Sequence, residues 1–277
     1  MALDVDNALG AFLKARRGQV SPQEAGVAAV GRRRVPGLRR DELAALAGVS
    51  EPYLVRLEQG RDRRPSPQVL DALARALALD AEGTEYLHEL ARGQERPAVA
   101  AAPEAVGPGV QHLLDGWSGA AAYLRGRTFD VLAANALARA LSPLFAPGRN
   151  LVRDIFLDPA ARALYADWDL IAQQAVASLR AAVGAALDDP ALGALVAELE
   201  AGSPEFGVLW AIQDVRATRN DVKRFSHLTA GALALRRQVL SVPEAPGQCI
   251  IAYYAEPGSA SETALARLGE DAGAVSG

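Results

Sequence analysis

Apolar side chains recur at helical spacing through the first third of the chain. In each of five segments an apolar residue returns every three or four positions, which places the apolar residues on one face of a helix. The segments cover residues 3–17, 41–47, 50–59, 66–77 and 81–92. Five short helices with one apolar face each predict a compact all-α domain.

The pattern changes after residue 110. Five short runs are apolar or alternate between apolar and polar residues, which is typical of strands. These runs cover residues 121–124, 129–133, 218–227, 232–240 and 248–256. Helical periodicity occupies the other segments, which cover residues 110–117, 135–143, 159–187, 190–201 and 204–214. Two strands, inserted helices and three more strands predict an α+β domain with a five-stranded antiparallel sheet.

Residues 93–109, GQERPAVAAAPEAVGPG, interrupt both patterns and hold three prolines, so this segment is predicted to be a linker. A chain of 277 residues is also long enough for two domains at about 150 residues each. The predicted organisation is therefore an all-α domain at residues 1–92, the linker at residues 93–109 and an α+β domain at residues 110–277.

Within the first domain, residues 38–59, LRRDELAALAGVSEPYLVRLEQ, predict two helices joined by a tight turn, which makes residues 1–92 a helix-turn-helix domain. Gly48 suits the left-handed conformation that ends many helices, and Ser50 can cap the next helix. Leu54 and Leu57 face the first helix, which leaves the opposite face of the second helix exposed. This arrangement is typical of a unit whose second helix enters the major groove of DNA, and also of an ordinary helical corner.

Arginine is concentrated around this motif. Residues 32–64 hold nine arginines and five acidic residues, a local net charge of +4 in a chain whose net charge is −4. A local excess of arginine favours contact with the phosphates of a nucleic acid. Arg32, Arg33 and Arg34 lie in a predicted loop, where they serve either as an arm on DNA or as a solvated surface.

The same stretch resembles a known family. AGVSEPYLVRLEQG followed by RPSPQVLDALARAL is similar to the repressor-type helix-turn-helix transcription regulators known as the XRE family. The resemblance implies DNA contacts for nine residues, which are Arg40, Ser50, Glu51, Pro52, Tyr53, Arg56, Arg61, Arg63 and Arg64. Glu51, Pro52 and Arg56 are expected at base edges, and the other arginines and Tyr53 are expected near phosphates.

The second domain has a resemblance of its own. Six segments are similar, in this order, to the C-terminal domain of the MmyB-like transcription regulators: FDVLAANALARAL, GRNLVRDIFLDP, ADWDLIAQQAVASLRAA, SPEFGVLW, KRFSHLTAGALAL and APGQCIIAYYAEPGS. The resemblance implies a PAS-like fold with a pocket for a small molecule or lipid.

Five side chains of the second domain are candidates for contact with such a ligand, and they are Trp168, Phe206, Trp210, Arg224 and His227. The three aromatic residues lie on predicted helices that pack on the sheet, where they serve either as core or as the wall of an apolar pocket. Arg224 and His227 lie near the end of a predicted strand. They either pair with a carboxylate head group or are ordinary residues of the strand edge.

Catalytic and metal-binding patterns are absent from the sequence. The three histidines are isolated, and no HExxH, CxxC, Gly-x-Ser-x-Gly or Gly-rich phosphate loop occurs. The single cysteine excludes a disulfide within the chain. The sequence therefore predicts no enzymatic activity, no metal and no cofactor.

The first residues are acidic, and no uncharged apolar run approaches 18 residues. A signal peptide would need a basic start and an apolar run, and a membrane span would need the longer run. We therefore expect a cytoplasmic protein that has no membrane partner.

Together these features predict a transcription regulator that binds double-stranded DNA as a homodimer, because one short helix reads only a few base pairs. Its second domain is expected to sense a small apolar or fatty-acid-like ligand. The alternative is a second domain that binds no ligand and acts only in protein interaction or dimerisation. A third interpretation, an enzyme with an appended DNA-binding domain, is disfavoured because no catalytic pattern is present.

Overall fold

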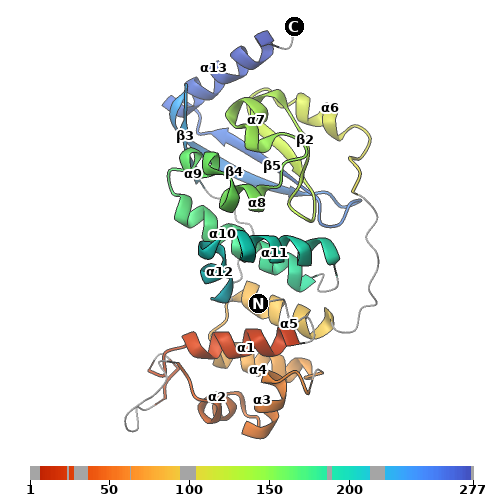
Figure 1. Ribbon diagram of the computed structural model, residues 1–277, viewed down its shortest axis with the longest axis vertical. Coiled ribbons are helices and arrows are strands. Elements are labelled where there is room, and N and C mark those ends of the chain that lie inside the picture. The colour runs from red at the N-terminus through yellow and green to blue at the C-terminus, as the bar shows by residue number, and fades with distance from the viewer. Residues whose placement is uncertain are drawn as a thin grey trace. The chain divides into compact units, whose positions relative to one another are not determined.

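The structure is a computed structural model, and it describes residues 7–23, 25–27, 37–62, 64–93, 104–185, 189–212 and 222–275. The chain divides into two compact units, each made of two stretches of sequence (Figure 1). The first unit joins residues 1–100 with residues 176–217, and the second joins residues 101–175 with residues 218–277.

The first unit begins with the five helices that the periodicity predicts. They are α1 (Ala8–Gln19), α2 (Arg40–Ala47), α3 (Glu51–Glu58), α4 (Pro67–Ala76) and α5 (Ala81–Gly93). Helix α1 packs on α3 and α5, and α2 packs on α3 and α4. The predicted start of the first helix at residue 3 falls partly outside the described residues.

Local signals fix the boundaries of these helices as predicted. Gly48 ends α2 with φ +66°, a conformation that favours glycine because a Cβ atom would be strained there. The Ser50 hydroxyl caps α3 by accepting a hydrogen bond from the Tyr53 N–H at 3.3 Å. The Ser66 hydroxyl caps α4 in the same way, with the Val69 N–H at 3.4 Å.

Three later helices also contribute to the first unit. Helix α11 (Pro190–Gly202) and helix α12 (Pro204–Ala211) lie wholly within it, although they follow the predicted linker in sequence. Helix α10 (Trp168–Ala185) contributes its residues from Val176 onward. Most of the predicted linker lies outside the described residues.

The second unit contains the predicted five-stranded antiparallel sheet. Its strands are β1 (Ala121–Arg125), β2 (Val131–Ala134), β3 (Val222–His227), β4 (Gly231–Ser241) and β5 (Cys249–Ala255). Their order across the sheet is β2-β1-β5-β4-β3, with antiparallel pairing throughout. The fold prediction, a helical helix-turn-helix region followed by an α+β domain, is therefore confirmed.

The two faces of the sheet are covered to different extents. Its inner face packs against five helices, which are α7 (Ala136–Leu141), the 3-10 helix η2 (Pro143–Phe145), α8 (Leu151–Leu157), α9 (Pro159–Leu164) and α13 (Ala260–Val275). The first residues of α10 join the same core. On the outer face, the single helix α6 (Val110–Asp115) packs on β1 and β2 among the described residues.

The structure differs from the predicted helices of this unit in two ways. The predicted helix at residues 159–187 is interrupted at Tyr165, which leaves helical geometry to form an antiparallel bridge with Phe225. Helices α8 and α13 were not predicted. Each of these helices has a capping side chain just before it in sequence. Asn150 caps α8 by accepting a hydrogen bond from the Arg153 N–H, and Ser259 caps α13 by accepting one from the Glu262 N–H.

Among the described residues, no helix combines the length and apolar character needed to cross a bilayer.

Candidate nucleic-acid interface and ligand site

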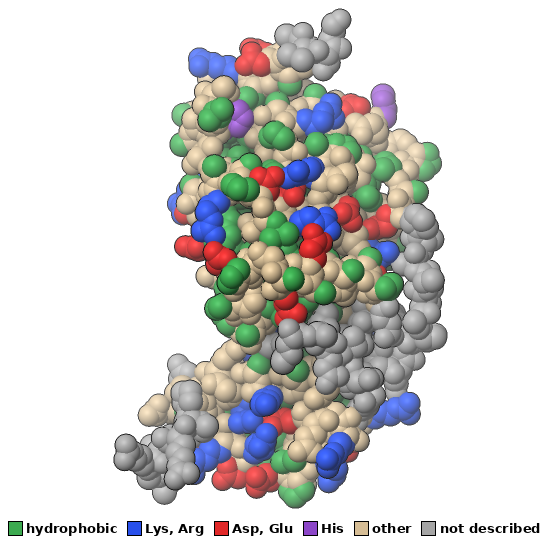
Figure 2. Space-filling model, in the orientation of Figure 1, with side chains coloured by type: hydrophobic (Ala, Val, Ile, Leu, Met, Phe, Trp, Pro, Cys, Tyr) green, Lys and Arg blue, Asp and Glu red, His purple; other side chains and the backbone are tan. Residues whose placement is uncertain are grey.

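Helix α3 presents one polar face to the surroundings and one apolar face to the core. Leu54 and Leu57 are fully buried against the neighbouring helices, as predicted. Glu51 and Pro52 are exposed, and the Arg56 side chain is 50% exposed. In the space-filling view, basic side chains gather with a few acidic ones over the helices around this face (Figure 2). The exposed face therefore offers a guanidinium and a carboxylate to a ligand.

The Arg56 side chain is held loosely by two neighbours on the same helix and turn. Its guanidinium carbon lies 5.5 Å from the centre of the Tyr53 ring, and its Nε atom lies 4.0 Å from Asp62 Oδ2. Contacts of this length leave the guanidinium available for bidentate pairing with a guanine edge. Burial, followed by the charge of Asp62, raises the pKa of Tyr53, so its hydroxyl stays protonated and can donate to a phosphate.

A basic turn follows α3. Gly60 has φ +67°, and the N–H groups of Arg61 and Asp62 donate to the Arg56 carbonyl oxygen at 2.9 and 3.2 Å. Arg61 and Arg64 are exposed beside this turn. Arg63 and the predicted arm at residues 32–34 lie outside the described residues.

A buried carboxylate that the sequence argument missed fixes α3 in place. Glu58, whose side chain is 1% exposed, binds Arg17 Nε through Oε1 and Arg40 Nε through Oε2, each at 2.6 Å. Arg17 also donates to the Leu38 carbonyl oxygen at 2.9 Å. Arg40, expected near a phosphate, is therefore bound to Glu58 while its side chain stays 42% exposed. The pair was missed because Arg17 and Glu58 are 41 residues apart in sequence.

Helix α1 approaches the end of α3 very closely. A Cβ atom on Gly10 would lie 2.6 Å from the Glu58 carbonyl oxygen and 2.7 Å from that of Leu57. Only glycine fits this contact without a backbone shift. The ion pairs of Glu58 and this contact together define the orientation of α3 relative to α1 and α2.

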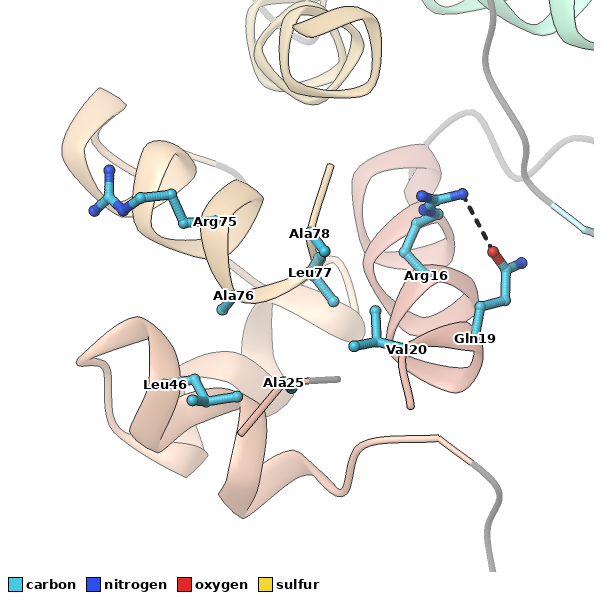
Figure 3. Close-up of a pocket in the computed structure, with 9 residues that line it drawn as sticks. All are labelled: Arg16, Gln19, Val20, Ala25, Leu46, Arg75, Ala76, Leu77 and Ala78. Atoms are coloured by element: carbon cyan, nitrogen blue, oxygen red, sulfur yellow. Dashed lines mark hydrogen bonds between the residues drawn. The ribbon is translucent and has the colours of Figure 1, made fainter. Parts of the chain in front are cut away.

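The first unit also contains an open pocket of about 460 Å³ (Figure 3). It is lined by Arg16, Gln19, Val20, Ala25, Leu46, Arg75, Ala76, Leu77 and Ala78. Arg16 Nη1 donates to Gln19 Oε1 at 3.2 Å on its rim. The pocket includes none of the residues predicted to bind a ligand.

The three aromatic ligand candidates are divided between the two units. Trp168 begins α10 beside the sheet core, where its indole N–H donates to the Ile155 carbonyl oxygen at 3.0 Å. Arg162 stacks over its ring at 3.6 Å. Phe206 and Trp210 lie on α12 in the first unit, with their rings stacked at 5.4 Å. The structure therefore does not bring the three together in one unit.

Arg224 and His227 occupy opposite faces of β3. Arg224 is exposed and pairs with Asp167 at 2.6 Å, and this hydrogen bond raises the pKa of Arg224. His227 Nε2 lies 3.1 Å from the Ala140 carbonyl oxygen, and its Nδ1 accepts from the Ala230 N–H at 3.0 Å. The hydrogen bonds assign the Nε2–H tautomer to His227. Both side chains therefore have partners within the protein.

The inner face of the sheet carries cations that the sequence argument did not identify. Lys223 is 4% exposed and its Nζ donates to Gln174 Oε1. Arg237 is half-buried and falls on the same face of β4 as the buried Leu233 and Leu235, because side chains alternate along a strand. The alternation of side chains along β4 could have placed Arg237 on the inner face. That step requires the strand's boundary and its register, which the sequence alone does not give.

Three tyrosines of this core lie near Arg237. It pairs in register with Tyr253, and the ring of Tyr253 lies 6.3 Å from that of Tyr123. Burial raises the pKa of Tyr123 and of Tyr165 well above the usual value, and the positive charge of Arg237 opposes both shifts. The hydroxyls therefore stay protonated. A guanidinium beside phenolic donors can bind a carboxylate or phosphate.

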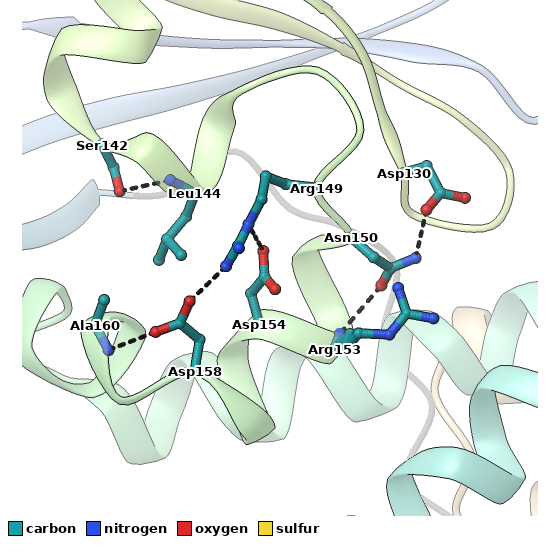
Figure 4. Close-up of polar contacts among 9 residues, drawn as sticks. All are labelled: Asp130, Ser142, Leu144, Arg149, Asn150, Arg153, Asp154, Asp158 and Ala160. Carbon is teal, nitrogen blue, oxygen red and sulfur yellow. Dashed lines mark hydrogen bonds and ion pairs between the residues drawn. The ribbon is translucent and has the colours of Figure 1, made fainter.

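A separate polar network supports the chain between β2 and α9 (Figure 4). Arg149 binds Asp154 at 2.8 Å and also binds Asp158, whose carboxylate caps α9 through the Ala160 N–H. Burial raises the pKa of Asp154, whereas the hydrogen bond from the Ala160 N–H lowers that of Asp158. These groups satisfy one another, so the network is structural. In the described ranges, no cluster of three or more His, Cys, Asp or Glu side chains is arranged to hold a metal.

Comparison with known proteins identifies both parts of the chain. Residues 106–268 match the family model described as MmyB-like transcription regulator ligand binding domain, which covers more than half of the chain. Residues 8–101 match the model of a helix-turn-helix domain. No curated protein matches the chain.

The Glu58 ion pairs generate a stability prediction. Glu58→Gln removes the charge that two guanidinium groups share and leaves Arg17 buried without a carboxylate, so unfolding free energy should fall by about 3 kcal/mol. Urea denaturation measures it. The control Asp62→Asn, at a partly exposed and longer contact, should change stability by less than about 0.5 kcal/mol. Equal losses for the two variants would contradict the role assigned to Glu58.

Proposed function

We propose that this chain, which belongs to the MmyB-like transcription regulators, is a sequence-specific DNA-binding regulator whose C-terminal domain senses a small apolar or fatty-acid-like ligand. The two matched domains support a ligand-responsive DNA-binding regulator. Domains of this kind are typical of transcription regulators and not of enzymes. Because its partner is DNA, we place its action in the cytoplasm.

The observation that carries the DNA-binding proposal is the exposed face of α3. This face carries Glu51, Pro52 and Arg56, which are exposed. The opposite face of α3 is buried through Leu54 and Leu57, and Glu58 binds the end of the helix to α1. A rigidly held helix can place these side chains at base edges, where Arg56 reads guanine and Glu51 accepts from a cytosine amino group. The DNA phosphates are then contacted by the remaining candidates, as the resemblance to the XRE family implies. These are Arg40, Ser50, Tyr53, Arg61, Arg63 and Arg64.

The ligand proposal is supported by the inner face of the sheet. Helices cover one face of a five-stranded antiparallel sheet, which supports a PAS-like fold. On β4 the inner face changes from the fully buried Leu235 to the half-buried Arg237 and Val239, so its cover of helices becomes thinner there. We assign the head group of the ligand to Arg237 and its apolar body to the aromatic core that includes Trp168.

Homodimer formation is supported by the outer face of the same sheet. Val222, Leu240 and Tyr254 are large apolar side chains that are 51%, 40% and 37% exposed on this face. Exposed apolar groups of this kind mark interaction surfaces. A homodimer would present two α3 helices to two half-sites of one operator.

Arg56 and Arg61 should affect DNA binding differently. Arg56→Ala should cost about 1–3 kcal/mol on an operator selected from random DNA and relax the preference at one base pair. Arg61→Ala should weaken binding to all sequences alike and reduce the slope of log affinity against log salt by about 0.9. Fluorescence anisotropy on selected and scrambled duplexes measures both effects. Identical losses on the two duplexes for both variants would rule out this orientation of α3.

The operator should contain two half-sites. A symmetric dimer places its two recognition helices about 10–10.5 base pairs apart, or at a multiple of that spacing. Hydroxyl-radical footprinting of the selected operator, together with sedimentation of the free protein, tests this spacing. One undivided half-site occupied by a monomer is the contradictory result.

The ligand should be an amphipathic acid held by Arg237. Oleate affinity, measured by isothermal titration, should fall at least tenfold in Arg237→Gln, which corresponds to about 1.4 kcal/mol. The matched control is Arg236→Gln, because Arg236 lies on the outer face of the same strand and pairs with Glu256. Wild-type protein that carries no extractable lipid and binds no oleate would support the ligand-free interaction module instead.

A further inference from the structure

A tyrosine of the DNA-binding helices packs against helix α10 of the first unit. Tyr86 on α5 is 5% exposed, and its ring packs nearly perpendicular to that of Phe12 on α1, with the ring centroids 5.1 Å apart. Arg180, Gly184 and Trp210, from α10 and α12, form what we call the Tyr86 socket. All of these residues belong to the same compact unit.

The socket is built around a buried guanidinium. Arg180 is 2% exposed, stacks 3.7 Å from the centre of the Trp210 ring and donates to the Trp210 carbonyl oxygen. It also forms a hydrogen bond with the Tyr86 hydroxyl. Burial raises the pKa of Tyr86 to about 12, so the hydroxyl remains neutral and accepts this bond. Burying an arginine has a large desolvation free energy, so its hydrogen bonds and ring contacts offset that cost only if their geometry is good.

Gly184 makes room for the ring. A Cβ atom at this position would lie 1.9 Å from Tyr86 Cε2 and 2.6 Å from Cδ2, which is closer than atoms can approach. The atoms that would be struck belong to a rigid aromatic ring and not to the end of a flexible chain. Helix α10 must therefore present bare backbone at Gly184 for Tyr86 to stay seated.

Helix α10 also contributes to the ligand-binding domain. Its first residues, Trp168 and Ile171, belong to the core beneath the sheet, whereas Arg180 and Gly184 lie two to four turns further along the same helix. A shift of α10 along its axis or about it would change both environments. Tyr86 in turn contacts α1, and α1 holds α3 through Arg17 and Gly10.

We propose that the Tyr86 socket is an intramolecular docking surface that transmits the state of the ligand-binding domain to the DNA-binding helices. This proposal rests on the proposed function, and it assigns the coupling between ligand binding and DNA binding to the Tyr86 socket. When the ring is seated, α10 and α5 move together. When it is withdrawn, the two helices move independently and ligand and DNA no longer influence each other's binding.

Hydrogen exchange of the full chain tests whether the ring is seated. Gly184→Ala should raise the exchange rate of the α5 amides at least tenfold because the new methyl group displaces the ring. Gly193→Ala, on α11 with no atom within 4 Å of the new Cβ, is the matched control and should leave α5 unchanged. Tyr86→Phe, which keeps the ring but loses the bond to Arg180, should raise the rate about threefold. It also provides the test if Gly184→Ala does not fold.

The second arm measures coupling on a DNA duplex selected from a random library. In the wild type and in Gly193→Ala, bound DNA should slow exchange in α10–α12, and oleate should change DNA affinity about tenfold. In Gly184→Ala or Tyr86→Phe both cross-effects should fall below twofold, with DNA affinity itself within threefold of wild type.

Two outcomes would overturn the proposal. One is a variant in which the α5 amides exchange faster while ligand and DNA still influence each other's binding as in the wild type. The other is that no substitution changes the exchange rate of the α5 amides. A wild type that binds no selected duplex would instead remove the proposed function. The α5 exchange rates would still decide whether Tyr86 is held by the socket.

Discussion

The buried carboxylate of Glu58 is the interaction on which the DNA-binding face depends. A lone carboxylate that is 1% exposed would be strongly destabilising, so it must be paired, and Arg17 and Arg40 supply the two positive charges. These residues come from α1, α2 and α3, which means that one ion cluster sets the relative orientation of three helices. The positions of Glu51 and Arg56 on the opposite side of α3 follow from that orientation.

The second domain uses buried polar groups in a different way. Its core is dominated by aromatic and aliphatic residues, yet Lys223 and Arg237 lie on the same inner face of the sheet. Cations in such a place have a large desolvation cost, which an anionic ligand can offset. The site proposed above would favour an acid over a neutral lipid of the same length, because an acid adds an ion pair with the Arg237 guanidinium.

Local signals in the sequence were enough to predict much of the fold. Gly48 and Ser50 act within one turn of their own position, so the helix-turn-helix boundaries could be read directly. The five strands followed from short runs that are apolar or that alternate between apolar and polar residues. Contacts between distant residues could not be predicted, because the Arg17–Glu58 pair and the Tyr86 socket depend on helix packing that no local pattern specifies. Helix α13 is a third case, because the sequence holds its cap at Ser259 but the C-terminal segment carries no predicted helix.

The central claim is that ligand and DNA bind to one coupled protein. The most direct test is the affinity for the selected operator, measured on a single preparation that is first stripped of lipid and then reloaded with oleate. The account predicts at least a tenfold difference between the two states, which corresponds to about 1.4 kcal/mol of coupling free energy. Equal affinities, with oleate binding demonstrated in the same samples, would contradict it.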